Sequence, residues 1–71
     1  MKLTNGQKFA QAPAGQVWVQ SIRTGERHKF ACIKAPDSER WYAPVGVMGA
    51  VWKKALYMEM RFIFIGPVIG A

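Results

Sequence analysis

The stretch that decides the fold is QVWVQSIRTGERHKFACIK, residues 16–34, where apolar and polar side chains alternate on both sides of a Thr-Gly turn. A period of two is typical of β-strands, because successive side chains point to opposite faces of a sheet. Val, Ile, Phe and Trp, which favour strands, are frequent in this stretch. We therefore predict a β-hairpin with strands at 16–23 and 28–34.

The length of the hairpin loop decides which side chains share a face. An even loop, 24–25 or 24–27, pairs odd positions of the first strand with even positions of the second. One face then holds Val17, Val19, Ser21, His28, Phe30 and Cys32, and the other holds Trp18, Gln20, Ile22, Arg27, Lys29 and Ala31. A three-residue loop would reverse this assignment. We favour the four-residue loop, because a two-residue turn would force the β-branched Thr24 to a positive φ.

The first face has the composition of a core, and the second has that of a binding surface. The position of Trp18 stays open between core and exposed face, because a large indole is also among the best core-filling side chains.

The remaining sequence predicts further short elements. Asn5-Gly6 indicates a turn in a small opening hairpin between Leu3 and Phe9. The Pro, Asp and Ser of residues 35–40 indicate a turn, and 40–47 form a short strand interrupted by Pro44 and Gly46. Apolar spacing predicts a helical turn near 47–55. Alternation over 57–65 predicts a long final strand.

These elements predict an all-β single domain, 1–71, resembling a small SH3-like barrel in strand count and spacing, with four to five short antiparallel strands. The alternative is an α+β fold, in which a helix at about 46–57 packs on a three-stranded sheet. Such folds host many unrelated roles, so the fold alone does not indicate the function.

Charge gives the clearest indication of a partner. Ten Lys and Arg against four Asp and Glu give a net charge of +6, which favours nucleic acid or an acidic protein surface. Aromatic side chains beside cations are typical of surfaces that bind single strands. The predicted binding residues are Trp18, Arg23, Arg27, Lys29, Lys34, Arg40, Trp41, Lys53 and Lys54.

The sequence lacks the residues of a catalytic or metal site. His28 and Cys32 lie about 13 Å apart if they share a strand, too far for a thiol–imidazole pair. One His and one Cys do not provide the four ligands of structural zinc, and no phosphate-binding loop motif occurs. We expect no enzyme activity, no cofactor and no metal.

Cysteine usage and hydropathy bear on the compartment. The single Cys32 cannot form an internal disulfide, which favours the reducing cytoplasm. Only ten uncharged residues, 62–71, end the chain, whereas a membrane-spanning helix needs about 20 apolar residues. We therefore expect a soluble protein with no membrane span.

Two functions follow as hypotheses. The first is a small basic nucleic-acid-binding module. The second is a small accessory or inhibitor protein, of the kind that viruses and plasmids encode, that docks on a larger host protein or ribonucleoprotein complex through aromatic and Met side chains. The hydrophobic C-terminal strand, FIFIG at 62–66, also predicts a homodimer, because an exposed apolar edge strand tends to pair.

Overall fold

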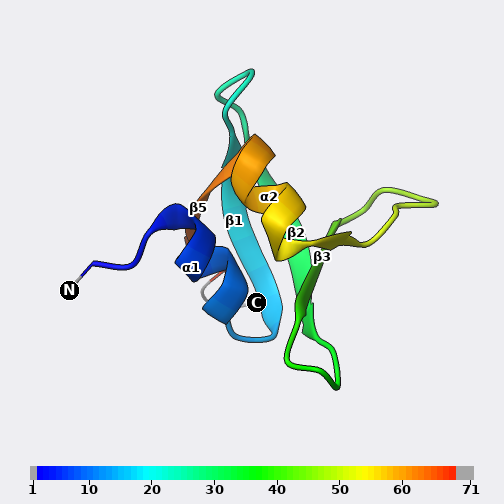
Figure 1. Ribbon diagram of the computed structural model, residues 1–71. Helices are drawn as coiled ribbons and strands as arrows, with labels where there is room; N and C mark the ends of the chain where they lie inside the picture. Colours follow the sequence, from blue (N-terminus) through cyan, green and yellow to red (C-terminus); the bar gives the residue numbers. More distant parts are fainter. Residues whose placement is uncertain (1, 69–71) are drawn as a thin grey trace.

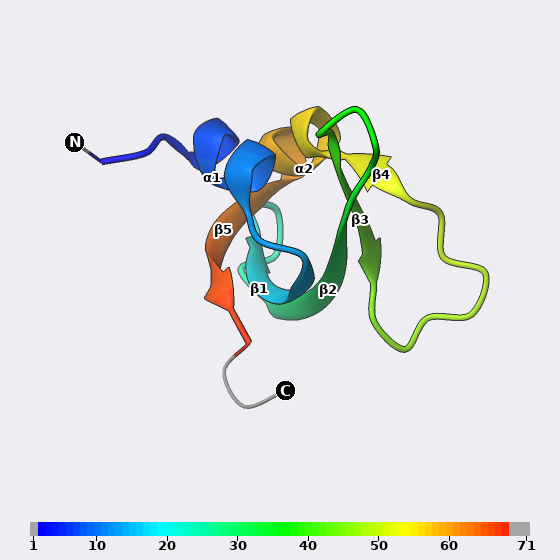
Figure 2. The same cartoon turned by 90° about the horizontal axis from the view of Figure 1, so that it is seen from below.

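The computed structural model describes residues 2–68, which form a mostly antiparallel β structure with short helices. The sheet has five strands in the order β4-β3-β2-β1-β5. It is strongly curved, and both helices lie across its concave side (Figures 1 and 2). The elements are α1 (Asn5–Gln11), β1 (Gly15–Ser21), β2 (Arg27–Lys34), β3 (Arg40–Pro44), β4 (Lys53–Lys54), α2 (Ala55–Arg61) and β5 (Phe62–Pro67).

The sheet does not close into the barrel that strand count and spacing predict. β4 and β5 stand at its two edges and do not pair with each other. Helices bridge the open side instead, so the described residues have a β-rich, α+β arrangement (Figure 2). The reason is length: β4 has only two residues, and α2 takes up the chain that a longer closing strand would need.

The core lies between the concave face of the sheet and the two helices. Phe9 of α1 and Met58 of α2 are fully buried there against Val17 and Val19 of β1. The Phe9 ring meets the rings of Tyr42 and Phe64 edge-on, with both centroid distances at 5.3 Å. The Tyr42 hydroxyl donates a hydrogen bond to the Phe9 carbonyl oxygen, so the one polar atom of this ring is satisfied. The complete buried cluster is Phe9, Ala12, Val17, Val19, Phe30, Cys32, Tyr42, Ala55 and Met58.

The β1–β2 hairpin confirms the predicted faces. Val17 pairs with Phe30 and Trp18 with Lys29, so odd positions of β1 lie opposite even positions of β2. The loop has four residues as favoured, but it consists of 22–25 and not 24–27, because the Ser21 N–H bonds the Glu26 oxygen at 2.8 Å. Ile22 therefore lies in the loop, where it is exposed, and not on the outer strand face.

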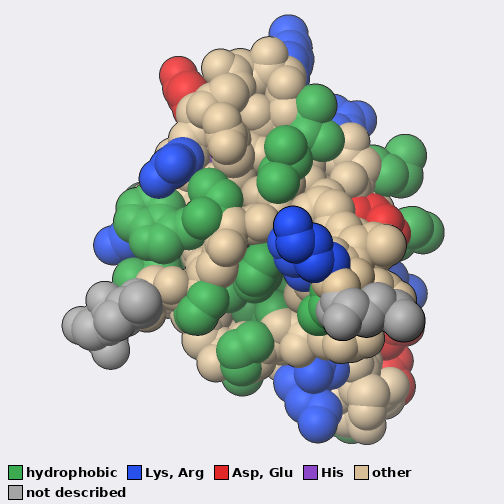
Figure 3. Space-filling view, turned by 90° about the vertical axis from the view of Figure 1, so that its left-hand side faces the viewer, with side chains coloured by type: hydrophobic (Ala, Val, Ile, Leu, Met, Phe, Trp, Pro, Cys, Tyr) green, Lys and Arg blue, Asp and Glu red, His purple; other side chains and the backbone are tan. Residues whose placement is uncertain are grey.

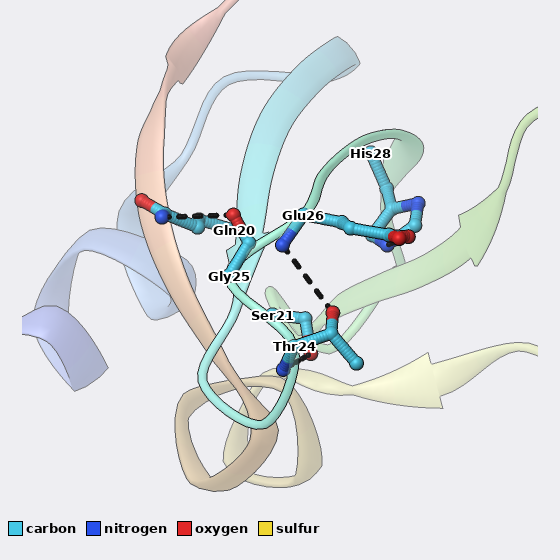
Figure 4. A network of polar contacts seen from close by, with 6 residues as sticks. All are labelled: Gln20, Ser21, Thr24, Gly25, Glu26 and His28. Carbon is cyan, nitrogen blue, oxygen red and sulfur yellow. Dashed lines mark hydrogen bonds and ion pairs between the residues drawn. The ribbon is translucent and has the colours of Figure 1, made fainter.

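Local hydrogen bonds explain the position of this loop. Gly25 adopts a φ of 77°, a conformation that glycine accepts readily. The Thr24 N–H bonds the Ser21 hydroxyl, and the Thr24 hydroxyl accepts from the Glu26 N–H (Figure 4). The Gln20 side chain donates to the Gly25 oxygen. Thr24 is thus used as a hydrogen-bonding turn residue, a role that short hydroxyl side chains favour.

The predicted opening hairpin around Asn5-Gly6 is wrong, since these residues begin α1. Thr4 caps the helix: its hydroxyl accepts from the Gln7 N–H, and the Gln7 side chain accepts from the Thr4 N–H. This reciprocal arrangement is a capping box, and its sequence signature, Thr-x-x-Gln, is present at 4–7. The helix places Phe9 in the core, where burial outweighs the turn preference of Asn-Gly.

The C-terminal third also differs from the prediction. The long strand at 57–65 is replaced by α2 through Arg61 and by β5 from Phe62. The helical turn near 47–55, and the alternative helix at 46–57, are not formed as predicted. Instead residues 45–52 form a loop, and the helix starts later, at Ala55. Residues 55–61 are rich in Ala, Leu, Met and Glu, which favour a helix intrinsically, and Ala55 and Met58 fall on its buried side.

Candidate nucleic-acid interface

The convex face of the sheet carries the strongest candidate site. Both helices lie on the concave side (Figure 2), so no helix of the described chain covers this outer face. Strand register places Trp18 of β1 opposite Lys29 of β2, and Trp41 of β3 opposite Lys54 of β4. Arg27 lies opposite Gln20, two residues from Lys29 and therefore on the same face.

Each of the two indoles on this face is paired with an ammonium group. The Lys29 Nζ lies 5.4 Å from the centroid of the Trp18 ring, and the Lys54 Nζ lies 5.4 Å from that of the Trp41 ring. Contacts at this distance are attractive, by about 0.5–1 kcal/mol at exposed sites, because the π-face is electron-rich. Both rings are partly exposed and both lysines are exposed. Trp18 is thus neither sealed in the core nor fully in solvent.

Two alanines separate the Trp–Lys pairs. Ala31 of β2 lies opposite Ala43 of β3, between the level of Trp18 and Lys29 and the level of Trp41. Strand geometry puts the Cα atoms of the two tryptophans about 13 Å apart along the strands and about 10 Å apart across them, or about 16 Å in all. The face therefore presents two indole rings, each with an ammonium group over it, and small alanine side chains lie between them. The pairing of these two alanines cannot be predicted from the sequence, because it depends on the register between residues 28–34 and 40–44.

Apolar side chains complete the outer face. Ile33 lies opposite Trp41, and Ile63 and Ile65 are on the solvent side of β5; all three are more than 40% exposed. Figure 3 views the side of the molecule where α1 and β5 lie, and it shows hydrophobic side chains gathered there beside Lys and Arg. Asp37 and Glu39 lie in the β2–β3 loop, and Glu26 lies next to the hairpin loop, so the outer strand positions carry cations and no carboxylate among the described residues.

The other predicted binding residues lie elsewhere. Arg23 is in the hairpin loop, and Lys34 pairs with Arg40 at the far end of β2 and β3. The Arg40 guanidinium donates from Nε to the Ala12 oxygen at 2.8 Å and from Nη1 to the Ser38 oxygen at 2.7 Å, which ties β3 to the end of α1. The Lys53 Nζ lies 4.9 Å from the Tyr57 ring centroid, facing α2. The structure thus gathers Trp18, Arg27, Lys29, Trp41 and Lys54 and separates the remaining four.

A groove that the sequence did not reveal opens on the concave side. It consists of two adjoining cavities, of about 480 and 270 Å³, that share the side chains of Phe30, Pro44 and Phe62. Arg23, Glu26 and His28 line the larger cavity at the hairpin end, and Lys53 and Tyr57 line the smaller one. His28 Nε2 lies 3.9 Å from a Glu26 carboxylate oxygen. Only the pairing of strands distant in the sequence creates this groove.

Reactive chemistry is sparse in the described residues. Cys32 is buried, and burial raises the pKa of its thiol, which disfavours the nucleophilic thiolate. Within residues 2–68 no three His, Cys, Asp or Glu side chains gather as a metal site would require. Over the same residues, no helix has the length and apolar character needed to cross a bilayer.

Comparisons of the chain with protein families, with curated proteins and with solved structures give no significant match. The geometry of the chain itself therefore carries the functional argument.

Proposed function

We propose that the protein binds single-stranded nucleic acid through the convex face of its sheet. The observation that supports this most directly is the placement of two partly exposed indoles, each with an ammonium group 5.4 Å from its ring centroid. A base stacks on an aromatic ring while a neighbouring cation meets the phosphate, which is how sequence-tolerant single-strand binding works. The net charge of +6 adds long-range attraction for any polyanion.

The shape of the face favours a single strand over a duplex. The surface is convex and carries two partly exposed indoles, each with a lysine ammonium over its ring. A duplex hides the faces of its bases in its own stack and exposes only phosphates and groove edges. Two indoles whose Cα atoms lie about 16 Å apart would contact bases that are separated along one strand.

Tryptophan fluorescence tests the proposal directly. Unlabelled single-stranded oligonucleotides, dT and U homopolymers, are titrated into the protein at low and at near-physiological salt, with a duplex of equal length for comparison. We expect quenching by the single strands, stronger at low salt, because phosphate contacts release counterions.

Two variants, one with a single and one with a double Trp→Phe substitution, assign the quenching to a surface. Trp52→Phe is the matched control, because Trp52 is 40% exposed but lies in the 45–52 loop and not on the strands. Quenching should persist in Trp52→Phe and largely disappear in the double variant Trp18→Phe/Trp41→Phe. Quenching lost only in Trp52→Phe, or no binding at low salt, would overturn the proposal.

A second candidate is docking on a larger protein through the same face. It is favoured by the exposed Ile33, Ile63 and Ile65, because apolar side chains contribute little to polyanion binding but much to protein interfaces. A stoichiometric protein partner that is retained after nuclease treatment and high salt, and is lost in Ile33→Ser, would favour this candidate over the first.

A further inference from the structure

The loop between β3 and β4 is unusual in its composition. Residues 45–52, VGVMGAVW, contain neither a charged side chain nor a side-chain hydroxyl, amide or carboxyl group. Connecting loops normally run through water and are rich in polar and turn residues. This loop instead projects from the body of the molecule, as Figures 1 and 2 show from two directions.

The apolar side chains of the loop face solvent. Met48 is 98% exposed, Val47 56% and Val51 65%. Trp52, at the C-terminal end of the loop, is 40% exposed. Val47 and Val51 also line the two cavities of the concave groove. Several exposed apolar side chains in one loop mark a surface that a partner or a lipid phase covers in use.

Cations stand at the base of the loop. Lys53 and Lys54 follow Trp52 directly and form β4, where each ammonium group is held against an aromatic ring. The two point to opposite faces of the sheet, since Lys53 pairs with Tyr42 of the core and Lys54 with Trp41 of the outer face. From Trp41 to Met58 the chain contains no carboxylate. The order along the projection is therefore apolar tip, indole, then positive charge.

We propose that this loop inserts its tip into the surface of an anionic lipid bilayer. The order of groups matches the layers of a bilayer surface: apolar side chains enter the acyl boundary, an indole sits at the interface, and lysines meet acidic headgroups. A convex tip needs no complementary cavity in a fluid bilayer, whereas a protein partner would have to supply one. The contact is peripheral, and it shares Lys54, but neither Trp18 nor Trp41, with the proposed nucleic-acid face.

Vesicle binding tests the inference. The probes are vesicles of phosphatidylcholine alone and vesicles in which about one-third of the lipid is phosphatidylglycerol. The protein is Trp18→Phe/Trp41→Phe, which leaves Trp52 as its only indole. The expected result is a blue shift of Trp52 emission and co-sedimentation with the anionic vesicles, with much weaker binding to neutral ones.

Met48→Ser and Met60→Ser form a matched pair. Met60, on α2, is also strongly exposed but lies outside the loop. Met48→Ser should weaken partitioning into anionic vesicles about tenfold, because the variant no longer buries the apolar Met48 side chain in the bilayer. Met60→Ser should leave partitioning unchanged. Both variants should keep the wild-type unfolding midpoint, since neither side chain is buried.

Several outcomes would overturn the inference. These are no binding to anionic vesicles, equal partitioning of the two Met variants, or a Met48-dependent self-association in light scattering that replaces lipid binding. Oligonucleotide quenching of Trp18 and Trp41 is measured separately and does not depend on Met48, so failure here is distinguishable from failure of the proposed nucleic-acid function.

Discussion

The side-chain amide of Asn5 binds the open edge of β5 at Phe64. Its Oδ1 accepts a hydrogen bond from the Phe64 N–H at 2.8 Å, and its Nδ2 donates to the Phe62 oxygen at 2.8 Å. A peptide group of an added strand would supply the same donor and acceptor. Asn5 therefore occupies the part of the edge where a second FIFIG strand would begin to pair, and edge strands without such cover tend to associate. The homodimer predicted through this strand would have to displace Asn5 or pair farther along.

Replacing Asn5 should expose this edge and destabilise the fold. Asn5→Ala leaves the Phe62 oxygen and the Phe64 N–H without their partners in a partly buried position, so we expect a loss of about 1–3 kcal/mol in unfolding free energy. Urea unfolding measures the loss, and light scattering measures the accompanying rise in self-association. Asn5→Asp keeps the acceptor for Phe64 but places a carboxylate oxygen against the Phe62 carbonyl oxygen, so this variant should also be destabilised. Equal stability of all three proteins would show that the amide does not support this edge.

The two lysines over the indoles should contribute to nucleic-acid affinity through charge. Lys29→Gln and Lys54→Gln should each weaken binding of a single-stranded oligonucleotide and lower the slope of log affinity against log salt by about 0.7. Lys8→Gln is the control, because Lys8 lies on α1, across the sheet from the proposed face. If Lys8→Gln lowered the salt slope equally, affinity would depend on the net charge of the molecule and not on the lysines of the proposed face.

Stability should fall in alkaline solution because of two buried acids. Burial is the main cause that raises the pKa of Tyr42 above its ordinary value of 10.0, and burial raises the pKa of Cys32 above 9.0. The folded state therefore keeps protons that the unfolded chain releases. The stabilisation is complete below the unfolded-state pKa values and is lost as the pH rises above them, at up to about 1.4 kcal/mol per pH unit for each group.

Denaturant unfolding at a series of pH values between about 8 and 11 measures this loss, since that range brackets the ordinary pKa values of both groups. Tyr42→Phe removes one of the two titrations, so its unfolding free energy should decline less steeply with pH, although it starts lower because the bond to the Phe9 oxygen is lost. Parallel declines in the two proteins would exclude Tyr42 as a source of the pH dependence.

The Cys32 thiol should be protected in the folded protein. It is 2% exposed and its raised pKa disfavours the thiolate. A thiol reagent can therefore react only with molecules in which the chain has unfolded around Cys32. We expect native labelling to be at least about 1,000-fold slower than labelling in denaturant, since the unfolded fraction of a stable domain is smaller than this. Rapid stoichiometric labelling under native conditions would contradict the burial of this residue.

The sequence by itself determined those features that depend on neighbours along the chain. The alternation over 16–34 determined that this segment forms a hairpin and which of its side chains share a face. Once the loop has an even number of residues, odd positions of the first strand share a face with even positions of the second. The Thr-x-x-Gln signature at 4–7 marks the start of α1, although the Asn-Gly turn signal at 5–6 competes with it. The pairing of Trp18 with Lys29 does not follow from this pattern, because a loop at 24–27 would place Ile33 opposite Trp18; the loop at 22–25 sets the pair.

The tertiary structure alone decided what depends on distant segments. Alternation over 57–65 fits a strand, yet residues 55–61 are helical, because Ala55 and Met58 close the core over the concave face and the helix preference of the segment agrees. Trp41 reaches the outer face, and Ala43 lies beside Ala31, only through the register of β3 with β2. Asn5 meets Phe64 across 59 residues of chain. Such contacts depend on which surfaces bury the most apolar area together, a sum over the whole molecule that no local pattern contains.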